Sequence, residues 1–173
     1  MSWSHAPLHF NAIDAVYIVT CGTYLKRPFY RDTTDLDLFE SQLFEVARKH
    51  HIVLHAWCLL INHYHLVLAA DAGTLEPFFR HLHSIASIAL NRRQNAPGRK
   101  VWFQYRDTVI SDEGSYFARL KYVQENAVHH NVIANAENYK WCSARWLAEH
   151  ASRGFVKAVA EASLGSIKVE DDF

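Results

Sequence analysis

The amino-acid sequence predicts one α/β (α+β) domain, and three observations support this fold class. The 173 residues are 50% apolar and 13% aromatic, which is enough to bury one hydrophobic core. Segments rich in β-branched and aromatic residues alternate with segments whose apolar residues recur at helical spacing. The only central seam with proline and glycine, 95–98, is short enough to be a loop, so we expect a single domain over 1–173.

Four segments have strand character because β-branched and aromatic residues dominate them. The first ends at Gly22, and the last is an aromatic stretch that Arg106 could interrupt. The predicted strands are 15–22, 52–61, 64–70 and 101–110.

Three amphipathic helices are predicted between and after these strands. The first has aspartates near its start and Arg48 and Lys49 at its end, which suits the dipole of a helix. The predicted helices are 34–49, 74–93 and 115–128. After Ala144 we expect one or two further helices and a short acidic tail.

The composition argues against several classes of protein. Three cysteines, without a C-x-x-C pair, fit neither a disulfide framework nor a zinc ribbon. The first residues lack the pattern of a signal peptide, and no apolar run approaches the roughly 18 residues of a membrane helix. We therefore expect a cytoplasmic protein without a membrane partner. Lysine plus arginine equals aspartate plus glutamate at 18 each, so a nucleic acid would be bound through a local patch rather than a global basic field.

A pair of histidines stands out in the apolar stretch 57–70. His63 and His65 are two positions apart and follow Asn62 directly. On a strand, this spacing directs both imidazoles to one face, where they could bind a divalent ion. The chain has 12 histidines, so the alternative is a chance pair whose rings only find hydrogen-bond partners.

The sequence around this pair, L-L-I-N-H-Y-H-L-V-L, resembles the histidine-hydrophobic-histidine (HUH) signature of single-tyrosine DNA nucleases. It is similar to the version of this signature in REP-associated and other IS200-like tyrosine transposases, with Tyr64 as the bulky middle residue. The segments Y-I-V-T at 17–20 and W-C-S-A at 141–144 are also similar to that family. The resemblance implies a ferredoxin-like HUH nuclease fold, with a mainly antiparallel sheet of four to five strands and packed helices. It covers about 15–146 and leaves 147–173 as a helical extension.

A second family motif lies in the helix predicted at 115–128. Y-V-Q-E-N-A resembles the family sequence Y-I-x-x-N-P, which implies that Tyr122 is the nucleophile and Asn126 a further metal ligand. These residues are one helical turn apart and share a face. Ala127 replaces the usual proline; if the helix continues, His129 shares the face of Tyr122. The alternative is that Tyr122 only packs, as most tyrosines on amphipathic helices do.

Basic and aromatic residues gather between the helix at 74–93 and the strand predicted at 101–110. Arg92, Arg93, Arg99 and Lys100 form the best candidate for contacts with DNA phosphates, although a solvated basic turn explains them nearly as well. The aromatic pair at 102–103 could be core, or could offer a ring to a nucleic-acid base.

The resemblance implies a metal-dependent single-stranded DNA endonuclease and strand transferase. His63, His65 and Asn126 would hold Mg²⁺ or Mn²⁺, and Tyr122 would form a 5′-phosphotyrosine with hairpin-containing DNA, in a monomer or a homodimer. One alternative, favoured by the zero net charge, is a domesticated protein that binds DNA or RNA hairpins without cutting them. Another is a metal-dependent hydrolase that uses water, which would leave Tyr122 without a role.

Overall fold

The computed structural model describes residues 14–71 and 73–166, which form one four-stranded sheet with helices on both faces. Every pairing in the sheet is antiparallel, and the strand order is β2-β3-β1-β4. This confirms the predicted α+β class and the mainly antiparallel sheet. The strands are Asp14–Gly22 (β1), Val53–Leu59 (β2), His63–Asp71 (β3) and Arg106–Val109 (β4).

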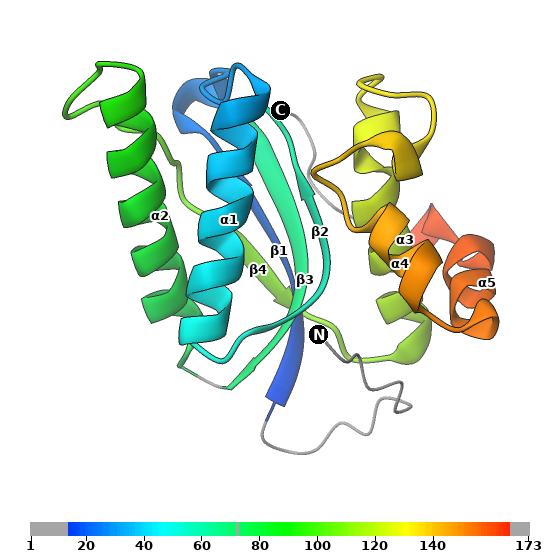
Figure 1. The fold of residues 1–173 in the computed structure, drawn as a ribbon. Helices are drawn as coiled ribbons and strands as arrows, with labels where there is room; N and C mark the ends of the chain where they lie inside the picture. The colour runs from blue at the N-terminus through cyan, green and yellow to red at the C-terminus, as the bar shows by residue number, and fades with distance from the viewer. Residues whose placement is uncertain (1–13, 72, 167–173) are drawn as a thin grey trace.

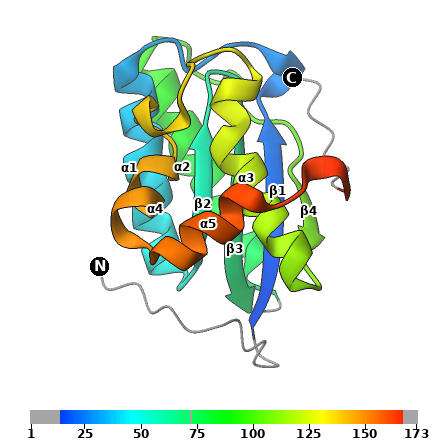
Figure 2. The ribbon, with the colours of Figure 1, turned by 90° about the vertical axis from the view of Figure 1, so that its right-hand side faces the viewer.

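The helices lie in two layers. α1 and α2 cover one face of the sheet, whereas α3, α4 and α5 lie on the other (Figure 1, Figure 2). Asp32 caps α1 by accepting from Asp35 N, and Asp112 caps α3 by accepting from Ser115 N. The helices are Thr33–Lys49 (α1), Leu75–Arg93 (α2), Glu113–His129 (α3), Ala144–His150 (α4) and Arg153–Glu161 (α5), with short 3-10 turns at Tyr24–Lys26, Ala136–Asn138 and Leu164–Ser166. No helix in the described ranges is long and apolar enough to cross a membrane.

The strand predicted at 101–110 is much shorter than expected. Regular pairing with β1 begins only at Arg106, opposite Thr20, although β1 itself continues to Gly22. Before Arg106, the chain contacts the end of β1 through an isolated bridge between Thr23 and Trp102 and a hydrogen bond from Phe103 N to Gly22 O. The aromatic segment 101–105 therefore lies outside the regular pairing of β1 with β4.

Alternation along β3 divides the interior into two cores. Tyr64, Leu66 and Leu68 face a core shared with α1 and α2. Val67 faces a second core shared with α3, and His63 and His65 have the same parity as Val67. The histidine pair therefore lies on the α3 face of the sheet.

The segment 141–143 closes the outer edge of β2. Leu59 N donates to Trp141 O at 2.9 Å, and Ser143 N donates to Trp57 O at 2.9 Å. Ser143 Oγ also accepts from Trp57 N at 3.1 Å. The W-C-S-A motif thus has a structural function, because it satisfies edge groups that would otherwise be open to pairing with another chain.

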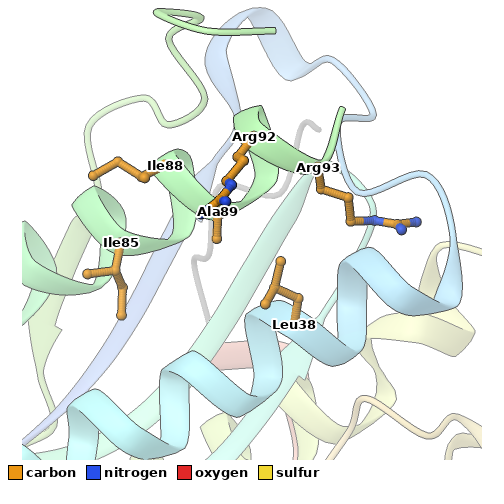
Figure 3. A pocket seen from close by; sticks show the side chains of 6 residues that line it. All are labelled: Leu38, Ile85, Ile88, Ala89, Arg92 and Arg93. Carbon is orange, nitrogen blue, oxygen red and sulfur yellow. The ribbon is translucent and has the colours of Figure 1, made fainter. Parts of the chain in front are cut away.

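A buried carboxylate joins α1 to the end of α2. Asp35 is only 1% exposed and accepts from Arg93 Nε at 2.7 Å and from Gln94 Nε2 at 2.8 Å. Arg93 also pairs with Asp32. Figure 3 shows Arg93 reaching from the end of α2 toward the start of α1, whereas Arg92 lies along α2 beside Ala89. Arg93 is therefore part of the helix packing.

We predict that Arg93→Ala lowers the free energy of unfolding by about 1–3 kcal/mol, because it removes a charged partner of the buried Asp35. The neighbouring exposed Arg92 is the matched control, and Arg92→Ala should stay within about 0.5 kcal/mol of wild type. Urea unfolding of the three proteins measures both effects. Equal stability of the two variants would contradict the structural role of Arg93.

Tyr64 is anchored beneath α2 by a histidine that is kept neutral. Tyr64 Oη lies 2.8 Å from His83 Nε2, and the His83 ring stacks on Trp102 with centroids 5.0 Å apart. Burial lowers the pKa of His83 to about 4. Protonation of His83 therefore opposes the folded state.

The lowered pKa of His83 makes the stability of the fold depend on pH. The pKa of His83 is about 6.5 in the unfolded chain and about 4 in the folded protein. At a pH between these values, the unfolded chain binds a proton that the folded protein does not bind. The contribution of His83 to stability is therefore fully present above this pH range and is lost as the pH falls through it. Between about pH 7 and about pH 5, the titration of His83 alone lowers the free energy of unfolding by about 2 kcal/mol.

The variant His83→Phe keeps an aromatic ring beside Trp102 and should lose correspondingly less stability on acidification. His51→Asn is the control, because His51 is exposed and asparagine tolerates its φ of 56°. Urea unfolding at the two pH values tests this prediction. An unchanged pH dependence in His83→Phe would refute it.

Candidate active site

Two histidines at the start of β3 form the centre of the site. His63 and His65 are both buried, and their ring centroids are 5.2 Å apart with the planes at 77°. The strand directs both rings to the face covered by α3, as the i and i+2 spacing predicts.

Each ring is oriented by an oxygen atom at Nδ1. His63 Nδ1 lies 2.9 Å from Asn62 Oδ1, and His65 Nδ1 lies 2.7 Å from Thr20 Oγ1. An amide oxygen only accepts, so the tautomer with the proton on Nδ1 would donate to Asn62 and leave the lone pair of Nε2 for an ion. Outer partners of this kind fix the ring orientation of histidines that bind metals through their other nitrogen.

Asn126 brings an amide oxygen to the histidines from α3. Its side chain is fully buried, and Oδ1 lies 3.2 Å from His63 Nε2. With the proton of His63 on Nε2 this contact is a hydrogen bond, and with the proton on Nδ1 both atoms carry lone pairs that a shared cation would stabilise. Two imidazole nitrogens and one amide oxygen are suitable donors for a divalent ion. In 14–71 and 73–166, no group of three or more His, Cys, Asp or Glu side chains is arranged to hold a metal, so an ion here would depend on the amide.

Tyr122 lies one turn before Asn126 and contacts the other histidine. Its half-buried ring meets His65 edge-on, with centroids 5.2 Å apart and planes at 82°. The structure thus brings Tyr122, Asn126, His63 and His65 together, although they come from two separate elements. Their roles in catalysis and metal binding stay predictions.

The end of α3 differs in one respect from the sequence-based expectation. The helix continues through Ala127 to His129, but His129 is exposed. The next residue, His130, lies against His63 instead, with ring centroids 4.7 Å apart. Thr20, which the antiparallel register pairs with His65, was not among the site residues predicted from the sequence. Its signal was the end of the first strand, but only the register connects it to the histidine.

The four predicted phosphate-binding residues do not form one uniform patch. Arg93 is bound to Asp32 and Asp35. Arg99 donates to Asn91 Oδ1 at 2.9 Å and to Gln94 Oε1 at 2.7 Å, and its guanidinium lies over the Phe29 ring. Both of these arginines therefore have partners within the protein, which favours a structural function for them.

The other two predicted residues, Arg92 and Lys100, lie apart from each other. Arg92 and Arg93 line an open hollow of about 610 Å³ between α1 and α2, with Leu38, Ile85, Ile88 and Ala89 (Figure 3). This hollow is on the helix layer opposite to α3, and hence not on the histidine face. Lys100 lies over the ring of Tyr24, at 4.5 Å from the centroid, beside the end of β1.

The fold is similar to solved structures, whereas the sequence comparisons found no match. No family model matches the chain, and no curated protein sequence matches it. A REP-associated tyrosine transposase bound to a REP hairpin is similar in structure, with a TM-score of 0.72 and 14% identity over 96% of this chain and 95% of that chain. A candidate transposase from Deinococcus radiodurans R1 has a TM-score of 0.48 and 15% identity over 79% of this chain and 98% of that chain.

At 14% identity, the first similarity shows the fold alone. This similarity of fold agrees with the sequence motifs, which resemble the same family. The chain has the fold of the HUH tyrosine transposases, of the REP-associated, IS200-like kind.

Proposed function

We propose that this protein is a transposase-like enzyme: a metal-dependent single-stranded DNA endonuclease and strand transferase that acts on hairpin-containing DNA. One observation carries the proposal. Tyr122 and Asn126, one turn apart on α3, contact His65 and His63, which are two residues apart on β3. A nucleophile and three metal-binding atoms are thereby held in one place by two rigid elements.

The proposed ligands of Mg²⁺ or Mn²⁺ are His63 Nε2, the corresponding nitrogen of His65, and Asn126 Oδ1. When bound there, the ion would polarise an oxygen of the scissile phosphate and stabilise the negative charge that develops on it. Thr20 and Asn62 hold the two imidazole rings in the orientation that this requires. The small number of protein ligands leaves room for oxygen atoms of the DNA.

In the proposed reaction, the phenolic oxygen of Tyr122 attacks the phosphorus atom. The bond from this oxygen to phosphorus forms while the bond from phosphorus to O3′ breaks, and the phenolic proton is lost. The products are a 5′-phosphotyrosine and a strand that ends in a 3′-hydroxyl. A second 3′-hydroxyl can reverse the step, so that cleavage and joining use the same residues.

Hairpin DNA is proposed as the substrate because the sequence motifs resemble those of REP-associated transposases, and the similar solved structure is a transposase of that kind. That transposase is bound to a REP hairpin. The zero net charge of this chain suits recognition through the shape and the unpaired bases of DNA more than through bulk electrostatics. Lys100 is the strongest candidate for a phosphate contact, since Arg93 and Arg99 are bound to side chains of the protein and Arg92 lies on the layer opposite to the histidines.

We predict that Tyr122→Phe forms no covalent adduct with DNA, while metal and hairpin binding persist. The change removes only the hydroxyl and keeps the ring that contacts His65. A denaturing gel of protein with labelled single-stranded hairpin DNA and Mn²⁺ measures the adduct. The control is Tyr105→Phe, at a half-buried tyrosine that packs on Phe79 in the other core, and it should form the adduct as wild type does.

The outcomes of this gel separate three functions. An adduct in Tyr122→Phe would refute the assignment of the nucleophile. Cleavage by wild type without any adduct would favour a hydrolase that uses water. Tight binding without cleavage would favour a hairpin-binding protein.

We predict separately that the metal site can be dissected by calorimetry with Mn²⁺ alone. His63→Ala and His65→Ala should abolish specific binding. Asn126→Ala should weaken it, and activity should partly return at high Mn²⁺ by mass action. Thr20→Val should cost about 10- to 100-fold in affinity, because it removes only the oxygen that orients His65.

A second histidine pair in the chain provides the control. His50 Nε2 lies 3.0 Å from His81 Nδ1, between the end of α1 and α2. His81→Ala removes this pair and should leave the Mn²⁺ affinity unchanged. The ligand assignment fails if His63→Ala and His65→Ala bind Mn²⁺ as wild type does.

A further inference from the structure

Two adjacent aromatic residues between α2 and β4 have opposite environments. Trp102 is 7% exposed and lies in the core under α1 and α2, whereas Phe103 is 56% exposed. Their neighbourhood is extended, because Trp102 forms a bridge with Thr23. Trp102 packs in that core, whereas the exposed side chain of Phe103 points away from it.

The backbone of Phe103 is fixed although its side chain is exposed. Phe103 N donates to Gly22 O at 2.9 Å, and the thiol of the buried Cys21 donates to Phe103 O at 3.6 Å. No other aromatic ring of the described chain is in contact with the Phe103 ring. The backbone that carries this exposed apolar ring is thus held in a defined place.

A positive charge lies beside this ring. Lys100 Nζ is 4.5 Å from the centroid of the Tyr24 ring and 5.8 Å from that of Phe103. Within 14–71 and 73–166, no carboxylate forms an ion pair with Lys100. Tyr24 N donates to Val101 O at 2.7 Å, which fixes the two segments together. Lys100 is therefore held by aromatic rings while its charge is available to an anion.

This aromatic and basic group is close to the proposed active site. Gly22, which binds the backbone of Phe103, is also the register partner of His63 in the pairing of β1 with β3. Strands are spaced by about 4.8 Å, so the backbones of Phe103 and His63 are about 10 Å apart. That separation suits a nucleotide next to a phosphate bound at the histidines.

We propose that Phe103 and Lys100 form a subsite for one unpaired nucleotide of single-stranded DNA, with the base stacked on Phe103 and a phosphate near Lys100. This rests on the proposed function, and it adds a base-binding residue on the side of the site opposite to β2. A flat apolar ring with an adjacent cation matches the way proteins hold single strands regardless of sequence. A duplex would gain nothing from the ring, because its bases are already stacked.

The test compares two DNA probes by fluorescence anisotropy: a hairpin with a single-stranded extension and the same hairpin with a blunt end. Phe103→Ala should weaken binding of the extended hairpin by about 5- to 150-fold, the loss measured for one stacked base, and should leave the blunt hairpin unchanged. Phe103→Tyr should restore the affinity. Lys100→Ala should lower the slope of log affinity against log salt by about 1.

The matched control is Ile88→Ala, at an apolar residue of α2 that is 66% exposed and lines the hollow on the opposite layer. It should bind both probes as wild type does. Thermal unfolding checks that all variants fold, and 2-aminopurine placed at each position of the extension identifies the stacked base, whose fluorescence should rise in Phe103→Ala.

Equal affinity of Phe103→Ala and wild type for the extended hairpin overturns the subsite even if the wild-type protein cleaves DNA. A wild-type protein that does not bind the extended hairpin overturns it as well. Conversely, binding that depends on Phe103 without any cleavage supports the subsite and refutes the proposed nuclease activity. The two proposals therefore fail separately.

Discussion

The alternation of side chains along β3 is the constraint on which the rest of the structure depends. Tyr64 is fully buried in the core under α1 and α2, so its neighbours His63 and His65 must face α3. A shift of one residue would place the imidazoles in the apolar core and Tyr64 at the site, with a large loss of buried apolar area. The packing of one tyrosine therefore determines the direction of both candidate ligands.

The second core holds α3 in the position that completes the site. Val123 and Ala127 are buried against the sheet and follow the candidate site residues Tyr122 and Asn126 directly in sequence. Because helical residues four positions apart share a face, docking of α3 delivers a ring to His65 and an amide to His63 at once. The continuation of α3 beyond Ala127 also brings His130 to His63. The geometry of the site is thus a consequence of helix packing and not of a flexible loop.

The two faces of the sheet have different functions. On one side, the buried Asp35 of α1 is paired with the more exposed Arg93 of α2, which gives a structural function to an arginine that the sequence also offered to DNA. On the other side, His63 and His65 lie between β3 and α3, where they contact Asn126 and Thr20. A buried charge must be paired to be tolerated, and this requirement removes Arg93 from the residues most readily available to a ligand.

The sequence by itself determined most of the elements and which candidate site residues share a face, because both depend on local periodicity. The spacing of His63 and His65, and of Tyr122 and Asn126, sets which side chains share a face, and the structure keeps both pairs. Tertiary structure decided the rest. Thr20 reaches His65 only through the register of β1 with β3, and the strand expected at 101–110 is reduced to Arg106–Val109 because regular pairing with β1 stops opposite Thr20. Outside that pairing, Trp102 is buried and its neighbour Phe103 is exposed, since neighbours of similar character become core or surface according to the segment that passes beside them.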